Sequence, residues 1–187
     1  IDNISAQIVD KKLPIIITSS DELSLPLTQN ILKEYSNSCI VLSSKFNALL
    51  LSDKLNKGKD RKKLLHVGGR NFSKLEFEQL RGEGVTFFLL REIRLGMYQN
   101  NWAHLIANNL TGNVLIYIDA SVFDPSLLSS SIDPGGLYWD ETLNLLKLII
   151  HDKTISGIVI TNYSKGNIDH NSSYLISKLI YKIISYL

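Results

Sequence analysis

Two aspartates close to the end of an apolar run are the residues of this sequence best suited to chemistry. Asp119 directly follows the run Val114–Ile118, and Asp124 comes five residues later, before a proline. Carboxylate oxygens grouped in this way are typical ligands of divalent metal ions. Position 121, between the two aspartates, holds a serine. The segment therefore indicates either a metal site or a site that has lost part of its ligands.

Six short apolar runs are spread along the chain, with helical patterns between them. The runs are Leu13–Thr18, Cys39–Leu42, Leu64–Val67, Val85–Leu89, Val114–Ile118 and Gly157–Ile160. They are continuous rather than alternating, as expected of strands that are covered on both faces. Strands that alternate with helices predict an α/β fold, a three-layer α/β/α sandwich with a mainly parallel sheet of about six strands. We expect one domain over residues 1–187.

Capping residues predict where two of the helices begin. Ser73-Lys-Leu-Glu76 predicts a capping box, and Ser24, two residues before Pro26, predicts another helix start. Further helices are expected over residues 91–110, 138–150 and 175–187, the last from apolar residues at helical spacing.

Composition excludes several classes of partner. The net charge of +2 gives no overall preference for nucleic acid. Residues 54–63 contain six Lys or Arg, a run more typical of a solvated loop than of a nucleic-acid contact. The only cysteine, Cys39, excludes an internal disulfide, and its apolar surroundings favour a core residue over a nucleophile.

The sequence also gives expectations for location. No apolar run reaches the roughly 18 residues that span a bilayer, and the first residues lack the pattern of a signal peptide. We therefore expect a cytoplasmic protein with no membrane partner.

The residues after the predicted strands carry a specific pattern. Asp119-x-x-x-x-Asp124-Pro125 follows one strand, Pro134-Gly-Gly-Leu137 with Glu141 leads into a helix, and Leu64–Arg70 reads LLHVGGR. These motifs resemble SFDxDxxDP, PGGLxxxE and IGxR of the ureohydrolase family, which includes arginase, agmatinase and formimidoylglutamase. The resemblance runs from about Leu13 to the C-terminus. It implies an arginase-like fold and hydrolysis of guanidino or amidine substrates by two manganese ions. It also implies an N-terminally short member of the family, since the first strands of the family enzymes precede this point.

The resemblance also places the family's metal ligands on this sequence. Its motif GGDHS falls on residues 18–22, so Asp21 takes the histidine position; a shift by one residue would instead put Asp21 on the aspartate and Glu22 on the histidine. In DxDxxDP, Asp119 takes the first ligand position and Ser121 replaces the second. Asp119 and Asp21 are therefore vestigial metal candidates.

The third ligand motif, DAHxD, falls on residues 43–47, where both aspartates and the histidine are missing and Lys45 stands in their place. We expect Lys45 to pair with Asp119 or Asp21 and neutralise it. No metal cofactor is then expected, with manganese required only if catalysis persists. The family's acidic residue after the last strand is also replaced, within residues 159–162.

Further residues are candidates for contacts in the remaining cleft. They are Lys45, Arg70, Asp124, Gly135, Gly136 and His170. His170 precedes the last helix, near the position at which the family binds substrate, whereas His66 is expected in the core and His104 and His151 at the surface.

Three functions are compatible with these residues, and the missing metal ligands favour the first. The first is a non-catalytic structural or regulatory member of the family, in a homo- or hetero-oligomer. The second is an active hydrolase of a guanidino or amidine substrate with a reduced metal site. The third is a binder of an unidentified small molecule or anion in the cleft.

Overall fold

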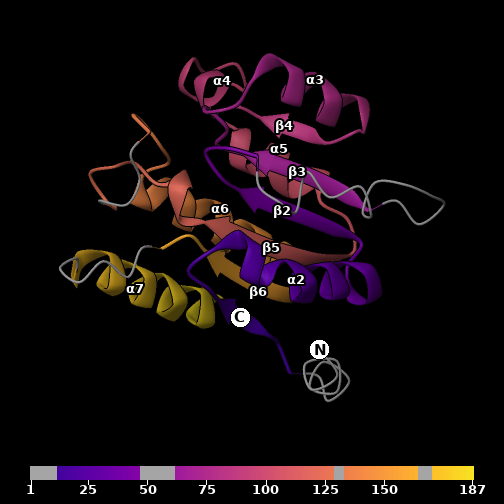
Figure 1. The fold of residues 1–187 in the computed structure, drawn as a ribbon, viewed down its shortest axis with the longest axis vertical. Helices are drawn as coiled ribbons and strands as arrows, with labels where there is room; N and C mark the ends of the chain where they lie inside the picture. The colour runs from indigo at the N-terminus through magenta and orange to yellow at the C-terminus, as the bar shows by residue number, and fades with distance from the viewer. Residues whose placement is uncertain (1–11, 47–61, 129–132, 164–169) are drawn as a thin grey trace.

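The computed structural model of the chain describes residues 12–46, 62–128, 133–163 and 170–187 (Figure 1). The strands are β1 (Ile15–Ile17), β2 (Ser38–Leu42), β3 (Lys63–Val67), β4 (Thr86–Phe88), β5 (Asn113–Asp119) and β6 (Thr154–Thr161). The helices are α2 (Asp21–Tyr35), α3 (Lys74–Gly82), α4 (Leu90–Arg94), α5 (Trp102–Asn109), α6 (Trp139–Asp152) and α7 (His170–Tyr186), with a 3-10 helix η1 (Ala120–Val122). Each of the six apolar runs contains or overlaps one strand, as predicted.

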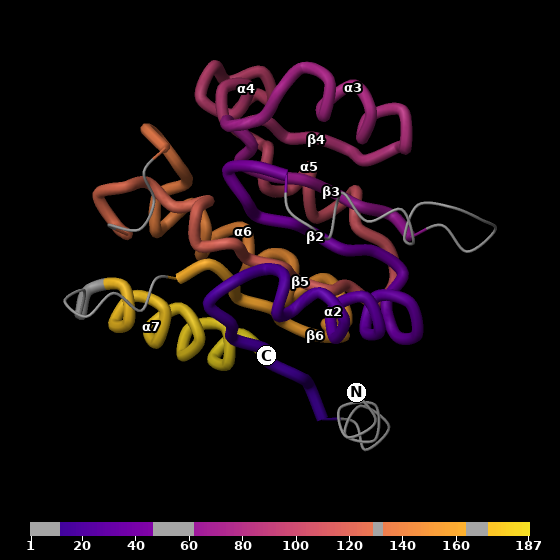
Figure 2. The backbone as a smooth tube through the Cα atoms, viewed as in Figure 1, coloured from indigo at the N-terminus to yellow at the C-terminus, as the bar shows by residue number. Residues whose placement is uncertain are grey.

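The described strands form one sheet in the order β1-β6-β5-β2-β3-β4, and every neighbouring pair is parallel. β1 and β4 are the edge strands, and Figure 2 shows β4, β3, β2, β5 and β6 following one another from top to bottom. The predicted parallel sheet of about six strands is confirmed. Because all strands run the same way, their carboxyl ends lie at a single edge.

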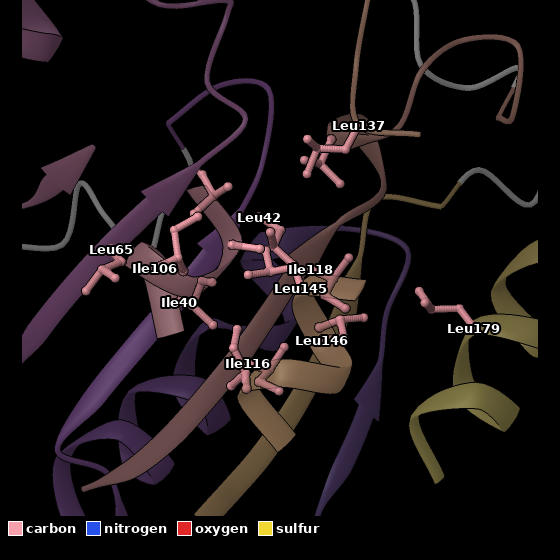
Figure 3. Close-up of a cluster of buried hydrophobic side chains, with 14 of the residues drawn as sticks. Ile40, Leu42, Leu65, Ile106, Ile116, Ile118, Leu137, Leu145, Leu146 and Leu179 are labelled. Atoms are coloured by element: carbon pink, nitrogen blue, oxygen red, sulfur yellow. The ribbon is translucent and has the colours of Figure 1, made fainter. Parts of the chain in front are cut away.

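Helices cover both faces of the sheet, which gives the expected three layers. On one face, Ile116 and Ile118 of β5 pack with Leu145 and Leu146 of α6, and α5 and α7 join the same cluster (Figure 3). These four side chains are fully buried, and each contributes about 1.5–3 kcal/mol to folding.

The opposite face is covered by α2 and α3. Ile31 and Leu32 of α2 and Leu80 of α3 pack against Leu115 of β5. The same cluster includes Cys39, which is fully buried, as predicted for a core cysteine.

Two helix predictions were wrong. The helix predicted from Ser24 begins at Asp21, and Ser24 is buried within it. The helix predicted over residues 91–110 is two helices, α4 and α5. Gly96, Gln99 and Asn100 have φ values of 68°, 52° and 58° between them, and this left-handed backbone ends a right-handed helix.

The other helix predictions were confirmed. The side chains of Ser73 and Glu76 form a capping box at the start of α3. The patterns over residues 138–150 and 175–187 correspond to α6 and α7. In the described part of the chain, none of the helices has the length and hydropathy needed to cross a membrane.

Candidate functional site at the carboxyl ends of the strands

The loops that follow five of the six strands meet at one edge of the sheet. The strand register pairs Asp119, the last residue of β5, with Thr161, the last residue of β6. On the other side, Ile118 pairs with Leu42 of β2. The ends of β2 and β6 therefore lie on either side of the end of β5, where Asp119 marks the candidate site.

Asp119 is fully buried, and both of its carboxylate oxygens accept hydrogen bonds. The backbone N–H of Ser121 donates to Oδ1 over 2.8 Å, and the side-chain amide of Asn162 donates to Oδ2 over 2.8 Å. Asn162 has a φ of 58°, in the left-handed region that asparagine tolerates better than most residues. The carboxylate thus joins the ends of β5 and β6 by neutral donors.

Asp21 and Asp119 both act electrostatically on the buried hydroxyl of Tyr117. Burial raises the pKa of Tyr117 to about 12, and the negative charges of Asp21 and Asp119 add to the rise. The hydroxyl lies 3.4 Å from Ser24 Oγ and 3.4 Å from Thr161 Oγ1. The two predicted metal candidates therefore act on the same tyrosine hydroxyl.

Lys45 does not pair with Asp119 or Asp21, so the expected ion pair was wrong. Its side chain is exposed, and it forms no ion pair with any described residue. Its backbone is fixed instead, since Ser43 Oγ donates to the Lys45 carbonyl over 2.6 Å. The ammonium group therefore faces solvent, and the side-chain hydrogen-bond donor to Asp119 is Asn162.

Arg70 links two loops rather than pointing freely into a cleft. Its Nη2 donates to the carbonyls of Ser121 at 2.9 Å, Phe123 at 3.3 Å and Asp133 at 3.3 Å, and Nη1 donates to Val122 O at 3.3 Å. Burial lowers the pKa of Arg70, and the negative charges of Asp133 and Asp124 oppose that change. The guanidinium thus holds the segment after β5 against the loop after β3.

Ser121, at the position of the family's second aspartate, belongs to a polar network. Its Oγ accepts from the backbone N–H of Ser44 over 3.2 Å. Ser44 Oγ donates to Asp133 Oδ2 over 3.0 Å, and Asn71 Nδ2 donates to Asp133 Oδ1 over 2.8 Å. Asp133 and Asn71 were not among the predicted site residues, although Asp133 directly precedes the Pro-Gly-Gly motif.

The two glycines of that motif allow backbone to pack on backbone. A Cβ on Gly136 would lie 2.3 Å from the nitrogen of Asp124 and 2.4 Å from the carbonyl carbon of Phe123. Gly135 has a φ of 73°, which glycine adopts without strain. Leu137 N then donates to Val122 O over 2.9 Å. Both glycines hold the turn against the segment after β5.

The helix that follows the turn is anchored by an ion pair. Arg94 and Glu141 form a bidentate pair, and Arg94 Nη2 also donates to Gly136 O over 2.7 Å. Glu141 Oε2 accepts from the backbone N–H of Tyr138 over 2.7 Å, and the Arg94 guanidinium lies 4.6 Å from the centre of the Tyr138 ring. Arg94 was missed at the sequence level, because nothing in its surroundings distinguishes it from a surface arginine.

Asp124 stabilises its own turn. Its Oδ1 accepts from the backbone N–H of Ser126 over 3.0 Å and from Ser126 Oγ over 2.6 Å. These bonds, with smaller effects from Arg70 and Arg94, lower the pKa of the Asp124 carboxyl.

The histidines lie away from this network where their side chains are described. His66 is fully buried among Phe46, Phe72 and Phe87, as predicted, and His104 and His151 are exposed. His170 begins α7, but its side chain lies outside the described residues, as does most of the basic segment 54–63.

The donor set at this edge does not fit a pair of manganese ions. Two adjacent divalent ions require several carboxylate or imidazole ligands to offset their charge. Over the described ranges, no three His, Cys, Asp or Glu side chains come together as a metal-binding group. Asp119 and Asp21 are the two carboxylates closest to the predicted positions, and Asp119 already accepts two hydrogen bonds.

Comparison with known proteins identifies the family. A sequence model of the arginase family matches residues 33–185. The chain belongs to the arginase family. The ureohydrolase resemblance of the strand-end motifs is thereby confirmed.

A curated relative from Synechocystis sp. is named N(1)-aminopropylagmatine ureohydrolase. This arginase-family chain is 29% identical to it over 126 residues, which cover 65% of the chain and 40% of the relative. The chain thus spans less than half the length of that relative.

Solved structures of low sequence identity share the fold. The structure of arginase from Bacillus subtilis matches this chain with a TM-score of 0.81 and 16% sequence identity. The match covers 98% of this chain and 75% of the arginase chain. The structure of formiminoglutamase from Trypanosoma cruzi matches with a TM-score of 0.82 and 13% sequence identity. This match covers 99% of this chain and 67% of the formiminoglutamase chain. The arginase-like α/β fold of this family member is therefore established.

Proposed function

We propose that this arginase-family chain is a pseudoenzyme that has lost the dinuclear manganese site and acts as a structural or regulatory protein. The observation that carries the proposal is the environment of Asp119. Both of its oxygens serve as acceptors for neutral donors, Ser121 N and Asn162 Nδ2. A carboxylate that accepts hydrogen bonds from amide donors of two segments links those segments. Among the described residues, the further carboxylates that a pair of metal ions needs are not beside it.

The loops around Asp119 support the same proposal. Arg70 donates to four backbone carbonyls, and Asp133 accepts from Ser44 and Asn71. Polar groups that converge on one another stabilise the loops, whereas polar groups of an active site must turn toward a substrate. No metal cofactor is required for this function.

A second candidate is an active hydrolase of a guanidino or amidine substrate with a reduced metal site. It is favoured by the position of Asp21 and Asp119 at the carboxyl-end edge of the sheet, since one divalent ion can bind through few carboxylates and several waters. The name of the Synechocystis relative suggests aminopropylagmatine as a substrate to test.

Urea release distinguishes the two candidates. The folded protein is incubated with manganese and with arginine, agmatine or N(1)-aminopropylagmatine at neutral and alkaline pH. We expect no urea above the level of the Asp119→Asn variant, with circular dichroism confirming that both proteins are folded. Release by the wild type that Asp119→Asn abolishes would reject the pseudoenzyme and support the hydrolase.

We also propose that the chain works within a homo- or hetero-oligomer. Ile17 on the edge strand β1 and Tyr181, Ile184 and Leu187 of α7 or its end are 43%, 69%, 55% and 58% exposed. Such apolar side chains favour burial against another chain. Light scattering of the protein alone and mixed with an active family member tests this, and a monomer in both solutions would contradict it.

A further inference from the structure

A cleft of about 550 Å³ lies at the amino ends of the strands, opposite the candidate site. Residues that begin or precede β1, β2, β3, β5 and β6 line it. The seven residues of β5 separate the two ends by about 20 Å at the usual rise of a strand. The volume falls in the range of small-molecule sites, and nothing in the proposed function uses this cleft.

A β-bulge shapes one wall of the cleft. Val114 of β5 pairs with Ile155 of β6, but the next residue, Leu115, pairs with Gly157, so Ser156 is the extra residue. Its Oγ lies 2.7 Å from Oγ of Ser36, which is almost fully buried and also lines the cleft. Bulges commonly redirect a side chain next to functional sites.

The charged groups of the cleft favour an anion. Lys12 and Lys62 line it, and neither forms an ion pair with a described residue. Glu34 is the acidic residue in the lining, and its carboxylate lies 3.1 Å from the ammonium of Lys33. Among the described residues, Lys12 and Lys62 therefore have no compensating acidic partner.

The carbonyls at the end of α2 do not cancel this preference. Ser36 Oγ donates to Ile31 O over 3.1 Å, and Asn113 Nδ2 donates to Tyr35 O over 3.2 Å. The second bond satisfies one of the carbonyls that would otherwise attract a cation to the helix C-terminus. Leu13 and Ile155 add apolar surface to the lining.

We propose that this cleft binds a small dicarboxylate. Its carboxylates pair with the ammonium groups of Lys12 and Lys62, and its carbon chain lies against Leu13 and Ile155. Two charges on an apolar spacer match the lining better than a compact inorganic anion does.

Calorimetric titration at low salt tests the assignment with three probes: glutarate, butyrate and inorganic phosphate. Glutarate should bind more tightly than butyrate, which has one carboxylate, and than phosphate, which has no apolar chain. The double variant Lys12→Gln/Lys62→Gln should bind glutarate about tenfold more weakly or worse. Lys74→Gln, on the exposed surface of α3, is the matched control and should bind as the wild type does.

Two results would overturn the proposal. One is equal affinity for the three probes, or binding of none at millimolar concentration. The other is unchanged glutarate binding in the double variant. Asp119→Asn should bind glutarate normally; loss of binding there would place the ligand at the carboxyl ends of the strands instead. The melting temperatures of all variants confirm that they are folded.

Discussion

Asn162 Nδ2 donates a hydrogen bond to Asp119 Oδ2 over 2.8 Å, across the ends of the neighbouring strands β6 and β5. Strand register makes this contact possible, because Thr161 pairs with Asp119 and Asn162 follows directly. The left-handed backbone at Asn162 then turns its chain away from the strand direction. A neutral amide therefore lies beside the carboxylate in the segment where the family resemblance expects an acidic residue.

Asn162→Asp should destabilise the protein by about 1–3 kcal/mol at pH 7, because it replaces the donor with a second carboxylate next to a buried one. Repulsion raises the pKa of one carboxyl in the folded state of this variant. The folded variant then binds more protons than the unfolded chain, so its stability should recover as the pH falls. Urea unfolding at pH 7 and pH 5 measures this difference.

Asn162→Gly is the matched control for that variant, since glycine also accepts the left-handed backbone but carries no charge. Asn162→Gly should lose the hydrogen bond to Asp119, but its stability should not recover at low pH as that of Asn162→Asp does. A similar pH profile for both variants would contradict the assigned role of Asn162.

Gly136→Ala should destabilise the protein by about 2–4 kcal/mol, because the added carbon would overlap backbone atoms of Phe123 and Asp124. Gly82→Ala, at the end of α3, is the control: its added carbon meets no atom within 4 Å, so stability should rise slightly. Thermal unfolding compares the two variants. Equal melting temperatures would show that the turn does not need close backbone contact.

Much of the fold was predictable from local patterns. Six continuous apolar runs identified all the described strands, and Ser73 with Glu76 identified the start of α3. The break between α4 and α5 was missed, because the isolated Gly96 does not by itself end a helical pattern and Gln99 and Asn100 adopt positive φ without a comparable sequence signal. The start of α2 was misplaced because the proline after Ser24 lies inside the helix, at Pro26.

The site was predictable in position but not in its contacts. Reading the residues after each strand located Asp21, Asp119 and the Gly135-Gly136 turn. The hydrogen-bond partner of Asp119, Asn162, could not be predicted from the sequence, because this contact depends on the register of β5 against β6. Lys45 was assigned to the wrong partner, since the direction of a side chain after a strand depends on loop geometry that no motif specifies.

His66 should make the protein less stable as the pH falls. Burial lowers its pKa from 6.5 to about 4, so the unfolded chain binds a proton between these pH values and the folded chain does not. Up to about 3 kcal/mol of stability should be lost as the pH falls through this window. The pH dependence of urea unfolding in His66→Leu should be weaker than in the wild type. Parallel pH profiles would show that His66 is not buried in its neutral form.

Arg70→Lys should cost about 2–3 kcal/mol, because an ammonium group cannot reproduce the planar set of donors that reaches four carbonyls. Arg81→Lys, on the exposed surface of α3, should change stability by less than about 0.5 kcal/mol. Chemical denaturation measures both. A small effect at Arg70 would mean that the loops after β3 and β5 are held by other contacts.

Metal content tests the loss of the dinuclear centre most directly. The protein is incubated with excess manganese, freed of unbound metal on a desalting column and analysed by mass spectrometry for bound ions, with Asp119→Asn as the comparison. We predict well below one tightly bound ion per chain and no difference between the wild type and Asp119→Asn. Two retained ions per chain that disappear in Asp119→Asn would contradict the account.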